Sequence, residues 1–245
     1  RRHPFDPALS GTDALRGGQS AMPAGLQSKA QSGVLPLIKD YISLTKPGVM
    51  ALLLVSTICP MILASHGEFH IALIFWALVG GALVSGSASA INCIWDRDID
   101  AVMARTMNRP VAAGRISPRA ALIFSLAIGG LGLWSLYRYL NPFAALTALF
   151  GHFFYVFIYT MWLKRTTPQN IVIGGAAGAI PPIVGWVGVT GQIDATAILL
   201  FLVVFLWTPP HFWALALNKN SDYSRAGVPM LPVVSGEHAT HIQML

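Results

Sequence analysis

The sequence predicts an all-α fold, a polytopic membrane bundle with six membrane-spanning helices. Of the 245 residues, 54% are hydrophobic and only 11% are charged, and the mean hydropathy is +0.60. That share of charge is too small to cover the surface of a soluble globule. Six apolar stretches are each long enough for a helix that crosses a bilayer, which takes about 20 residues. These observations together exclude a soluble globular protein.

Two segments precede the spans. Residues 1–34 are rich in Gly, Ser, Ala, Gln and Pro and have little periodicity, so we expect a disordered tail. Residues 35–45 instead repeat their apolar positions on one helical face, which carries Leu37, Ile38, Tyr41 and Ile42. This pattern predicts a short amphipathic helix that lies on the membrane surface. We therefore place the membrane domain at residues 35–245.

The six spans are expected at residues 48–66, 70–92, 118–138, 142–162, 169–189 and 195–217. With the N-terminus on the cytoplasmic side, all of the 16 Lys and Arg residues except Arg138 fall on that side, as the positive-inside rule requires. This orientation accounts for the net charge of +6, so no nucleic-acid-binding face is predicted. We expect a bacterial inner membrane, with the N-terminus and the polar loops in the cytoplasm, or a mitochondrial inner membrane.

The helices are expected to pack closely, because small residues recur along the second and fifth spans. These residues are Gly80, Gly81, Ser85, Gly86, Ser89, Gly174, Gly178, Gly185 and Gly188. Two proline pairs, Pro181-Pro182 and Pro209-Pro210, predict kinks in the fifth and sixth spans. Kinked helices leave room for a cavity between them.

The most informative polar stretch begins where the second span ends. Asn92, Asp96 and Asp100 are spaced by four residues, so a helix would place them on one face, each about 6 Å further along its axis. Their oxygens are suitable ligands for a divalent cation. Arg105 and Arg109 follow directly and could hold phosphate oxygens. The pattern fits a site for a diphosphate ester, and it fits equally a solvated loop whose opposite charges neutralise one another.

Further polar side chains follow the later spans and are expected at the same membrane edge. Tyr159, Lys164 and Arg165 end the fourth span, His211 follows the second proline pair, and Asp222 lies beyond the sixth span. The adjacent basic pair could equally mark topology alone. The histidine could instead form only a hydrogen bond between helices, but a functional role is favoured because ionisable groups in a span are costly and usually functional.

A lipid-tailed allylic diphosphate would place its chain among the helices and its anionic head at this edge. Magnesium, the expected cofactor, prefers one or two carboxylates together with phosphate oxygens. The metal ligands predicted in this way are Asn92, Asp96, Asp100 and Asp222. The basic groups predicted to stabilise the charge on the departing diphosphate are Lys164, Arg105 and Arg109. Lys46, before Pro47, could be a further phosphate ligand or a snorkelling anchor.

Several motifs of this sequence resemble those of the UbiA-type intramembrane prenyltransferases. The first signature of that family resembles residues 92–110, where the three evenly spaced residues precede Arg105-Thr106 and Asn108-Arg109-Pro110. Other stretches resemble one branch in particular, the protohaem IX farnesyltransferases or haem O synthases. These stretches are residues 163–167, 170–175, 181–186, 207–213 and 222–232. The resemblance runs from about Leu44 to Val234.

The resemblance implies a helical bundle around a central cavity, and transfer of a farnesyl group from farnesyl diphosphate, with Mg²⁺, to a vinyl group of haem B to give haem O. Asn92, Asp96 and Asp100 would form the first metal–diphosphate cluster, and Asp222 would remain from a second. The residues implied in substrate binding are Arg105, Arg109, Tyr159, Lys164, Arg165 and His211. His211 would face the haem as an axial ligand or a base. Haem A synthase or a terminal oxidase assembly are the protein partners implied.

Two other functions fit parts of the pattern. A UbiA-type enzyme for another aromatic acceptor or quinone precursor would share the first cluster but would not need residues 207–213. A transporter would have kinked helices too, but with ionisable groups near the bilayer midplane rather than at its edge. The family's second motif is richer in acids, where this chain has Asn218 and Asn220. The family also continues through further spans, whereas residues 235–243 are polar and the chain ends at Leu245, so we expect a truncated sequence.

Overall fold

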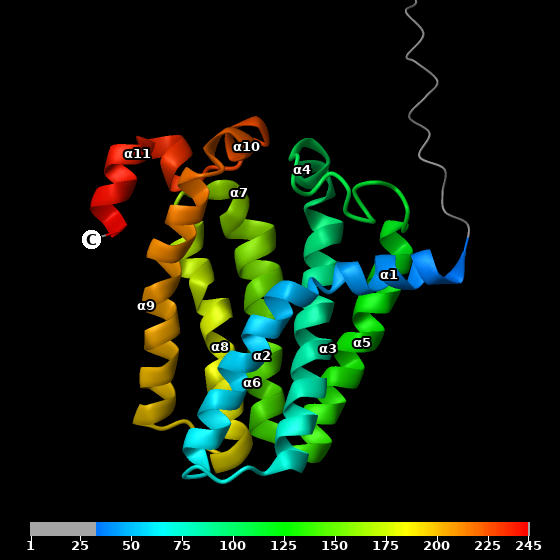
Figure 1. Ribbon diagram of the computed structural model, residues 1–245, viewed down its shortest axis with the longest axis vertical. Coiled ribbons are helices and arrows are strands. Elements are labelled where there is room, and N and C mark those ends of the chain that lie inside the picture. Colours follow the sequence, from blue (N-terminus) through cyan, green and yellow to red (C-terminus); the bar gives the residue numbers. More distant parts are fainter. Residues whose placement is uncertain (1–32, 245) are drawn as a thin grey trace, which may run out of the picture. The chain divides into compact units, whose positions relative to one another are not determined.

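The computed structural model describes residues 33–244, and these residues form helices joined by short turns (Figure 1). The predicted disordered tail lies outside the described residues up to position 32. The helices are α1 (Val34–Leu44), α2 (Pro47–Ala64), α3 (Ile71–Trp95), α4 (Arg97–Val102), α5 (Pro118–Tyr139), α6 (Pro142–Phe153), the π-helix η1 (Phe154–Leu163), α7 (Lys164–Thr166), α8 (Asn170–Thr190), α9 (Ala195–Leu217), α10 (Asn220–Arg225) and α11 (Leu231–Met244). The predicted all-α class is confirmed.

Six helices are long and apolar enough to cross a membrane. They are Pro47–Ala64, Ile71–Trp95, Pro118–Tyr139, Pro142–Thr166, Asn170–Thr190 and Ala195–Leu217. The six predicted spans are therefore confirmed, with the fourth span running to Thr166 instead of residue 162. Large apolar side chains such as Leu52, Ile123 and Val203 point outward from the bundle, 73%, 70% and 69% exposed. An apolar outer surface of this kind is suited to lipid and marks a multi-pass membrane protein.

Local sequence signals explain where several spans begin. Ser117 precedes α5, and its hydroxyl accepts a hydrogen bond from the amide of Ala120. Asn141 precedes α6 and accepts from the amide of Ala144 at 2.8 Å. In both helices proline occupies the first turn, where the missing N–H has no partner to lose. Asp194 caps α9 by accepting from two amides.

The helix α1 lies across the ends of the spans rather than along them (Figure 1). Ile38 and Ile42 on its apolar face are exposed, while Leu44 is fully buried against the bundle. Asp40 on the other face accepts two hydrogen bonds of 2.9 Å from Arg115 in the loop before α5. The predicted amphipathic helix is thus present, and an ion pair fixes it to the loop that follows α4.

Close packing of the spans depends on small residues, as predicted. At Gly185 in α8, an added Cβ would lie 2.1 Å from the carbonyl oxygen of Thr57 in α2, so any side chain there would force the two helices apart. The proline pairs lie inside the spans and do not end them. Both α8 and α9 continue as single helices through Pro181-Pro182 and Pro209-Pro210, because neighbouring helices can support locally freed backbone groups in a membrane bundle.

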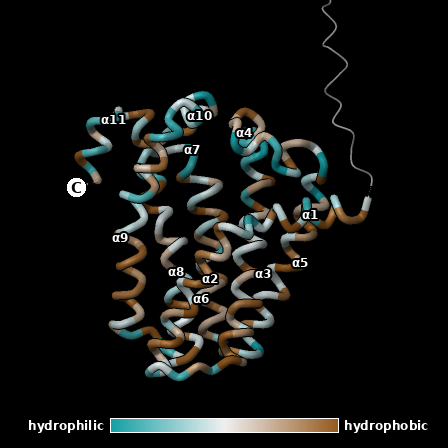
Figure 2. The backbone as a smooth tube through the Cα atoms, in the orientation of Figure 1, coloured by the Kyte–Doolittle hydropathy of each residue, from teal (hydrophilic) through white to brown (hydrophobic). Residues whose placement is uncertain are grey.

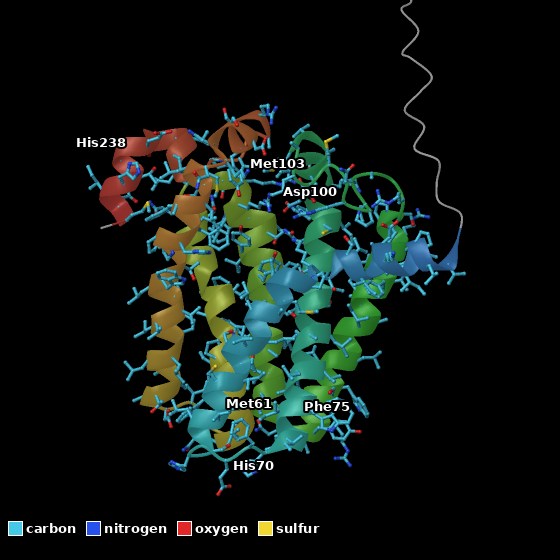
Figure 3. All side chains as sticks on the ribbon, viewed as in Figure 1. Met61, His70, Phe75, Asp100, Met103 and His238 are labelled. Carbon is cyan, nitrogen blue, oxygen red and sulfur yellow. The ribbon has the colours of Figure 1, made fainter. Side chains whose placement is uncertain are left out.

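The polar residues gather at one end of the bundle. The short helices α4, α7 and α10 all lie at this end (Figure 1), and the hydrophilic residues of the backbone trace concentrate there (Figure 2). Asp100 and Met103 mark this end, while Met61 and His70 mark the opposite one (Figure 3). A buried apolar cluster ties α4 and the segment after α10 to α8 and α9: Ile99, Met103, Ile171, Ala216, Val228 and Met230. The polar end is therefore a packed part of the fold.

Candidate active site

The centre of the polar end is formed by the three evenly spaced residues after the second span. Asn92 and Asp100 are each 2% exposed, and Asp96 is fully buried. The prediction of one continuous helix is wrong, since α3 ends at Trp95 and α4 begins at Arg97. The spacing survives the break, because the amides of Asp96 and Asp100 still donate to the carbonyls four residues earlier at 2.9 and 2.7 Å.

The amide group of Asn92 links three elements of the fold. Its Nδ2 donates to Asp96 Oδ2 at 2.7 Å and to Thr160 Oγ1 at 3.2 Å. Its Oδ1 accepts from Lys46 Nζ at 2.5 Å. Since every polar atom of the amide has a partner, the orientation of Asn92 is fixed by α3, η1 and the start of α2 together.

Lys46 reaches this network through an unusual backbone conformation. It has φ 52° and ψ 63°, the left-handed region, directly before Pro47. A residue before proline prefers extended conformations, and a non-glycine residue held in the left-handed region costs on the order of 1–3 kcal/mol. Burial lowers the pKa of its ammonium group. Its ammonium group is thus directed to Asn92 inside the bundle, whereas a snorkelling side chain would extend to water.

The two buried carboxylates are each paired with a basic side chain. Lys164 donates a hydrogen bond to Asp96 Oδ2, and Arg109 Nη1 donates to both oxygens of Asp100 at 2.8 and 2.7 Å. Burial tends to lower the pKa of Arg109, but the ion pair with Asp100 outweighs it and raises that pKa. Such pairing is what permits carboxylates to remain charged away from water.

Arg165, the neighbour of Lys164, faces outward to the next acid in the chain. It donates to both oxygens of Asp98 at 2.8 and 2.7 Å and to the carbonyl of Trp95 at 3.1 Å. These charge-assisted bonds lower the pKa of the Asp98 carboxyl group to about 2. Arg165 therefore ties α7 to the break between α3 and α4.

The π-helix η1 supplies the side chains on the third side of the site. A π-helix of ten residues is rare, since most are single turns inside α-helices and lie at functional sites. It presents Thr160, which is fully buried, to Asn92. Tyr159 lies against Gly174 in α8, where an added Cβ would be 2.2 Å from the tyrosine ring. Only glycine at position 174 leaves room for this ring.

The oxygen atoms of this site fit a divalent cation bound together with phosphate. Asp96 Oδ1 is buried and has no hydrogen-bond partner among the described residues, and Arg165 Nη2 lies 3.7 Å from it. Within residues 33–244 no cluster of three or more His, Cys, Asp or Glu side chains forms a cage of its own. Mg²⁺ typically takes one or two carboxylates and completes its shell with phosphate and water, which is compatible with Asp96 and Asp100.

The remaining predicted residues lie further out. Asp222 in α10 pairs with Arg225 rather than with Asp96 or Asp100. His211 is exposed on α9, with its ring stacked on Trp207 at 5.7 Å between centroids. Arg105 is exposed in the loop after α4. The structure thus brings together Asn92, Asp96, Asp100, Arg109, Lys164 and Arg165, but leaves Asp222, His211 and Arg105 outside their hydrogen-bond network.

One residue of the network, Thr160, was missed by sequence reasoning. It is a polar residue inside an apolar span, four positions before Lys164, and that spacing on a helix was a usable signal.

With this geometry described, the family can be stated. The model of the UbiA prenyltransferase family matches residues 52–245. The chain belongs to the UbiA prenyltransferase family.

Its relatives narrow the comparison to one kind of prenyltransferase. The "Protoheme IX farnesyltransferase" of Symbiobacterium thermophilum is 54% identical over 222 residues, which are 91% of this chain and 74% of that protein. The protein of the same name in Chloroflexus aurantiacus is 53% identical over 91% of this chain. The chain spans less than half the length of two such relatives, 38% of the Chloroflexus protein and 45% of one from Roseiflexus.

Solved structures support the fold. A UbiA homolog from Archaeoglobus fulgidus, described as bound to DMAPP and Mg²⁺, superposes with a TM-score of 0.68 at 20% identity, covering 84% of this chain and 72% of that one. A digeranylgeranylglyceryl phosphate synthase structure also gives a TM-score of 0.68, at 22% identity and with the same coverage. The bundle is thus the UbiA fold.

Proposed function

We propose that this protein transfers a farnesyl group from farnesyl diphosphate to a vinyl group of haem B, which gives haem O. The observation that carries the proposal is the 54% identity to a protein named protoheme IX farnesyltransferase, of which the chain covers 74%. The buried acidic and basic network at the polar end of the bundle supports it. An allylic diphosphate would lie with its charged head at this network and its chain among the apolar spans.

Some residues of the site would bind the metal ion and others would bind phosphate oxygens. Asp96 and Asp100 would bind Mg²⁺, oriented by the amide of Asn92. When bound, Mg²⁺ would stabilise the negative charge of the diphosphate as it leaves. Lys164 and Arg109, which pair with the two carboxylates in this structure, would contact the phosphate oxygens and stabilise the same charge.

Transfer then requires the C–O bond to the diphosphate to break, with the electron pair leaving on oxygen. The vinyl group of haem supplies the electrons for the new carbon–carbon bond, and a water molecule then adds its oxygen to the resulting cation and releases one proton. His211, exposed on α9, remains the candidate for the haem side of the reaction. Asp222 remains a candidate metal ligand on the side of the cation opposite to Asp96 and Asp100. For that role α10 would have to exchange the ion pair with Arg225 for one with the cation.

We further propose that the polar end faces the cytoplasm of a bacterial cell. Among the Lys and Arg side chains of the described residues, Arg138 at the end of α5 lies at the end opposite to the polar one. The remaining Lys and Arg residues lie in or beside α1, α4, α7 and α10 or their loops. The positive-inside rule then orients the protein. Delivery of haem O to haem A synthase or to a terminal oxidase assembly would take place in the same membrane.

The test is mass analysis of haem extracted from membranes of cells that lack their own haem farnesyltransferase. Cells that express this protein should contain haem with the added mass of a farnesyl group and water. Cells that express the Asp96→Asn variant at the same level should contain unmodified haem B alone. A prenylated quinone precursor in place of modified haem would instead identify a different acceptor and would refute the proposal.

A further inference from the structure

A second polar pocket lies beside the candidate active site at the same end of the bundle. It has a volume of about 320 Å³ and lies between α4, the Arg165 side chain of α7, and the turn that follows α10. Its lining residues are Asp98, Ile99, Val102, Arg165, Arg225, Ala226, Gly227 and Val228. This volume is at the lower end of the range for small-molecule sites, so the pocket suits one polar part of a larger ligand.

Two guanidinium groups give the pocket its chemistry. Arg225 makes one side-chain hydrogen bond among the described residues, from Nη2 to Asp222, and its side chain is 62% exposed. A guanidinium has five N–H donors, so four of those on Arg225 remain available to a ligand. The Arg165 side chain is 33% exposed. Its Nε–H is available to a ligand, because its hydrogen bonds to the described residues come from Nη1 and Nη2.

The acids near this pocket are already neutralised, which argues against a second cation site. Asp98 is held by both terminal nitrogens of Arg165, and Asp222 is paired with Arg225. Such exposed pairs are weak and exchange readily with an incoming anion. Arginine binds carboxylates with two parallel hydrogen bonds, so the ligand that fits is an anion with paired oxygens.

The pocket is also distinct from the proposed diphosphate site. None of Asn92, Asp96, Asp100 and Lys164 lines it. Arg165 lies between the two sites, with its Nη2 3.7 Å from Asp96 Oδ1. Apolar walls from Ile99, Val102 and Val228 continue the pocket toward the buried cluster below. A ligand here would have an anionic end at Arg225 and an apolar body that approaches the site of transfer.

We propose that this pocket binds the propionate carboxylates of the tetrapyrrole acceptor, with Arg225 as the main anchor and Arg165 as the second. The proposal rests on the proposed function, since it assigns a place to the acceptor of that reaction. Propionates and diphosphate share the chemistry that arginine recognises. Held at Arg225, the propionates orient the ring so that a vinyl edge faces the diphosphate site.

The experiment compares protohaem with its dimethyl ester, whose propionates carry no charge. Binding to the purified protein in detergent is followed by the Soret absorbance, and KM for farnesyl diphosphate is measured separately. The wild type should bind protohaem about tenfold more tightly than the diester, the loss expected for one charge-assisted hydrogen bond. Arg225→Gln should lose most of this preference, with only the part due to Arg165 remaining, and leave KM for farnesyl diphosphate unchanged.

Two further variants make the result specific. Arg119→Gln removes an exposed arginine outside the pocket and should keep the wild-type preference. Val102→Phe keeps both arginines but fills the pocket. It should weaken the binding of protohaem about as much as Arg225→Gln does. This second variant tests the pocket even if Arg225→Gln fails to fold.

The outcomes separate this inference from the proposed function. If the wild type farnesylates haem but Arg225→Gln keeps the preference for protohaem, the propionate site is wrong and the function stands. If Arg225→Gln raises KM for farnesyl diphosphate instead, the pocket binds the diphosphate and the assignment is overturned. If the wild type neither binds nor farnesylates protohaem, the proposed function fails and this inference fails with it.

Discussion

The polar end of the bundle contains two acidic groups that are held in different ways. Asp96 and Asp100 are buried at the end of α3 and in α4. Asp96 is paired with Lys164 of α7, far along the chain, and Asp100 with Arg109 of the loop that follows α4. Asp222 lies on α10 and pairs with Arg225, three residues away, whose side chain is 62% exposed. The first group is held by the whole fold, and the second mainly by its own short helix.

This difference teaches which group is preorganised. Moving Asp96 would break its pair with Lys164 in α7, and moving Asp100 would break its pair with Arg109 in the loop before α5. Moving Asp222 breaks one surface pair, which is worth about 0–1 kcal/mol. The buried group is therefore a fixed half of the candidate metal site, and α10 is the half that can adjust to substrate.

The largest effect is expected from removing the buried charges. Asp96→Asn and Asp100→Asn keep the shape of the side chain but lose the charge proposed to bind Mg²⁺, so prenyl transfer should fall by about 10²- to 10³-fold. Asp98→Asn, an exposed acid of the same short helix, is the matched control and should lose less than about threefold in kcat. The measurement is the prenyl-transfer activity of the three purified variants. Equal losses of activity in all three would remove the distinction between the buried and exposed acids.

The next effect is on stability. Lys164→Met leaves the fully buried Asp96 without its closest counter-charge, which should cost about 3–5 kcal/mol in the free energy of unfolding. Arg225→Met should cost less than about 1 kcal/mol, because its pair with Asp222 is exposed. Denaturant unfolding in detergent compares the two. A second change, Asp96→Asn in the Lys164→Met background, should restore part of the loss.

A smaller effect should identify the role of Asp222. If α10 closes over the metal, Asp222→Asn should raise the Mg²⁺ concentration for half-maximal activity about tenfold, a weakening of about 1.4 kcal/mol, and leave stability unchanged. A Mg²⁺ titration of activity measures this shift. An unchanged titration curve with normal kcat would show that Asp222 is only the partner of Arg225.

The smallest effect is expected at Thr160. Thr160→Val removes the hydrogen bond to Asn92 at 3.2 Å and preserves the volume of the side chain. One neutral hydrogen bond is worth about 0.5–1.5 kcal/mol, so kcat should fall about three- to tenfold. Thr166→Val, whose hydroxyl bonds only to the backbone of its own helix, is the control and should retain full activity.

Much of the fold could be predicted from the sequence because membrane spans depend on a simple quantity. Apolar length alone locates α2, α3, α5, α8 and α9, and apolar periodicity locates α1. The local pair of Asp222 and Arg225 also follows from spacing, since residues three apart are neighbours on a helix.

The rest depends on tertiary structure. The choice of Arg109 rather than Arg105 as the partner of Asp100 depends on how the loop after α4 folds. The break at Asp96 and the left-handed backbone of Lys46 both place side chains in a shared network, and no local propensity favours either. Sequence spacing therefore predicted the members of the site better than their pairing.

The π-helix η1 has a consequence for how this site can change by mutation. Each residue in a π-helix turns the chain through a smaller angle than the roughly 100° of an α-helix. Deleting one residue between Phe154 and Thr160 would let the segment relax toward an α-helix and rotate its C-terminal half. Thr160 and Lys164 would then leave Asn92 and Asp96 in a single step. Deletion of a single residue in this apolar stretch would thus abolish activity, while many substitutions there would leave activity unchanged.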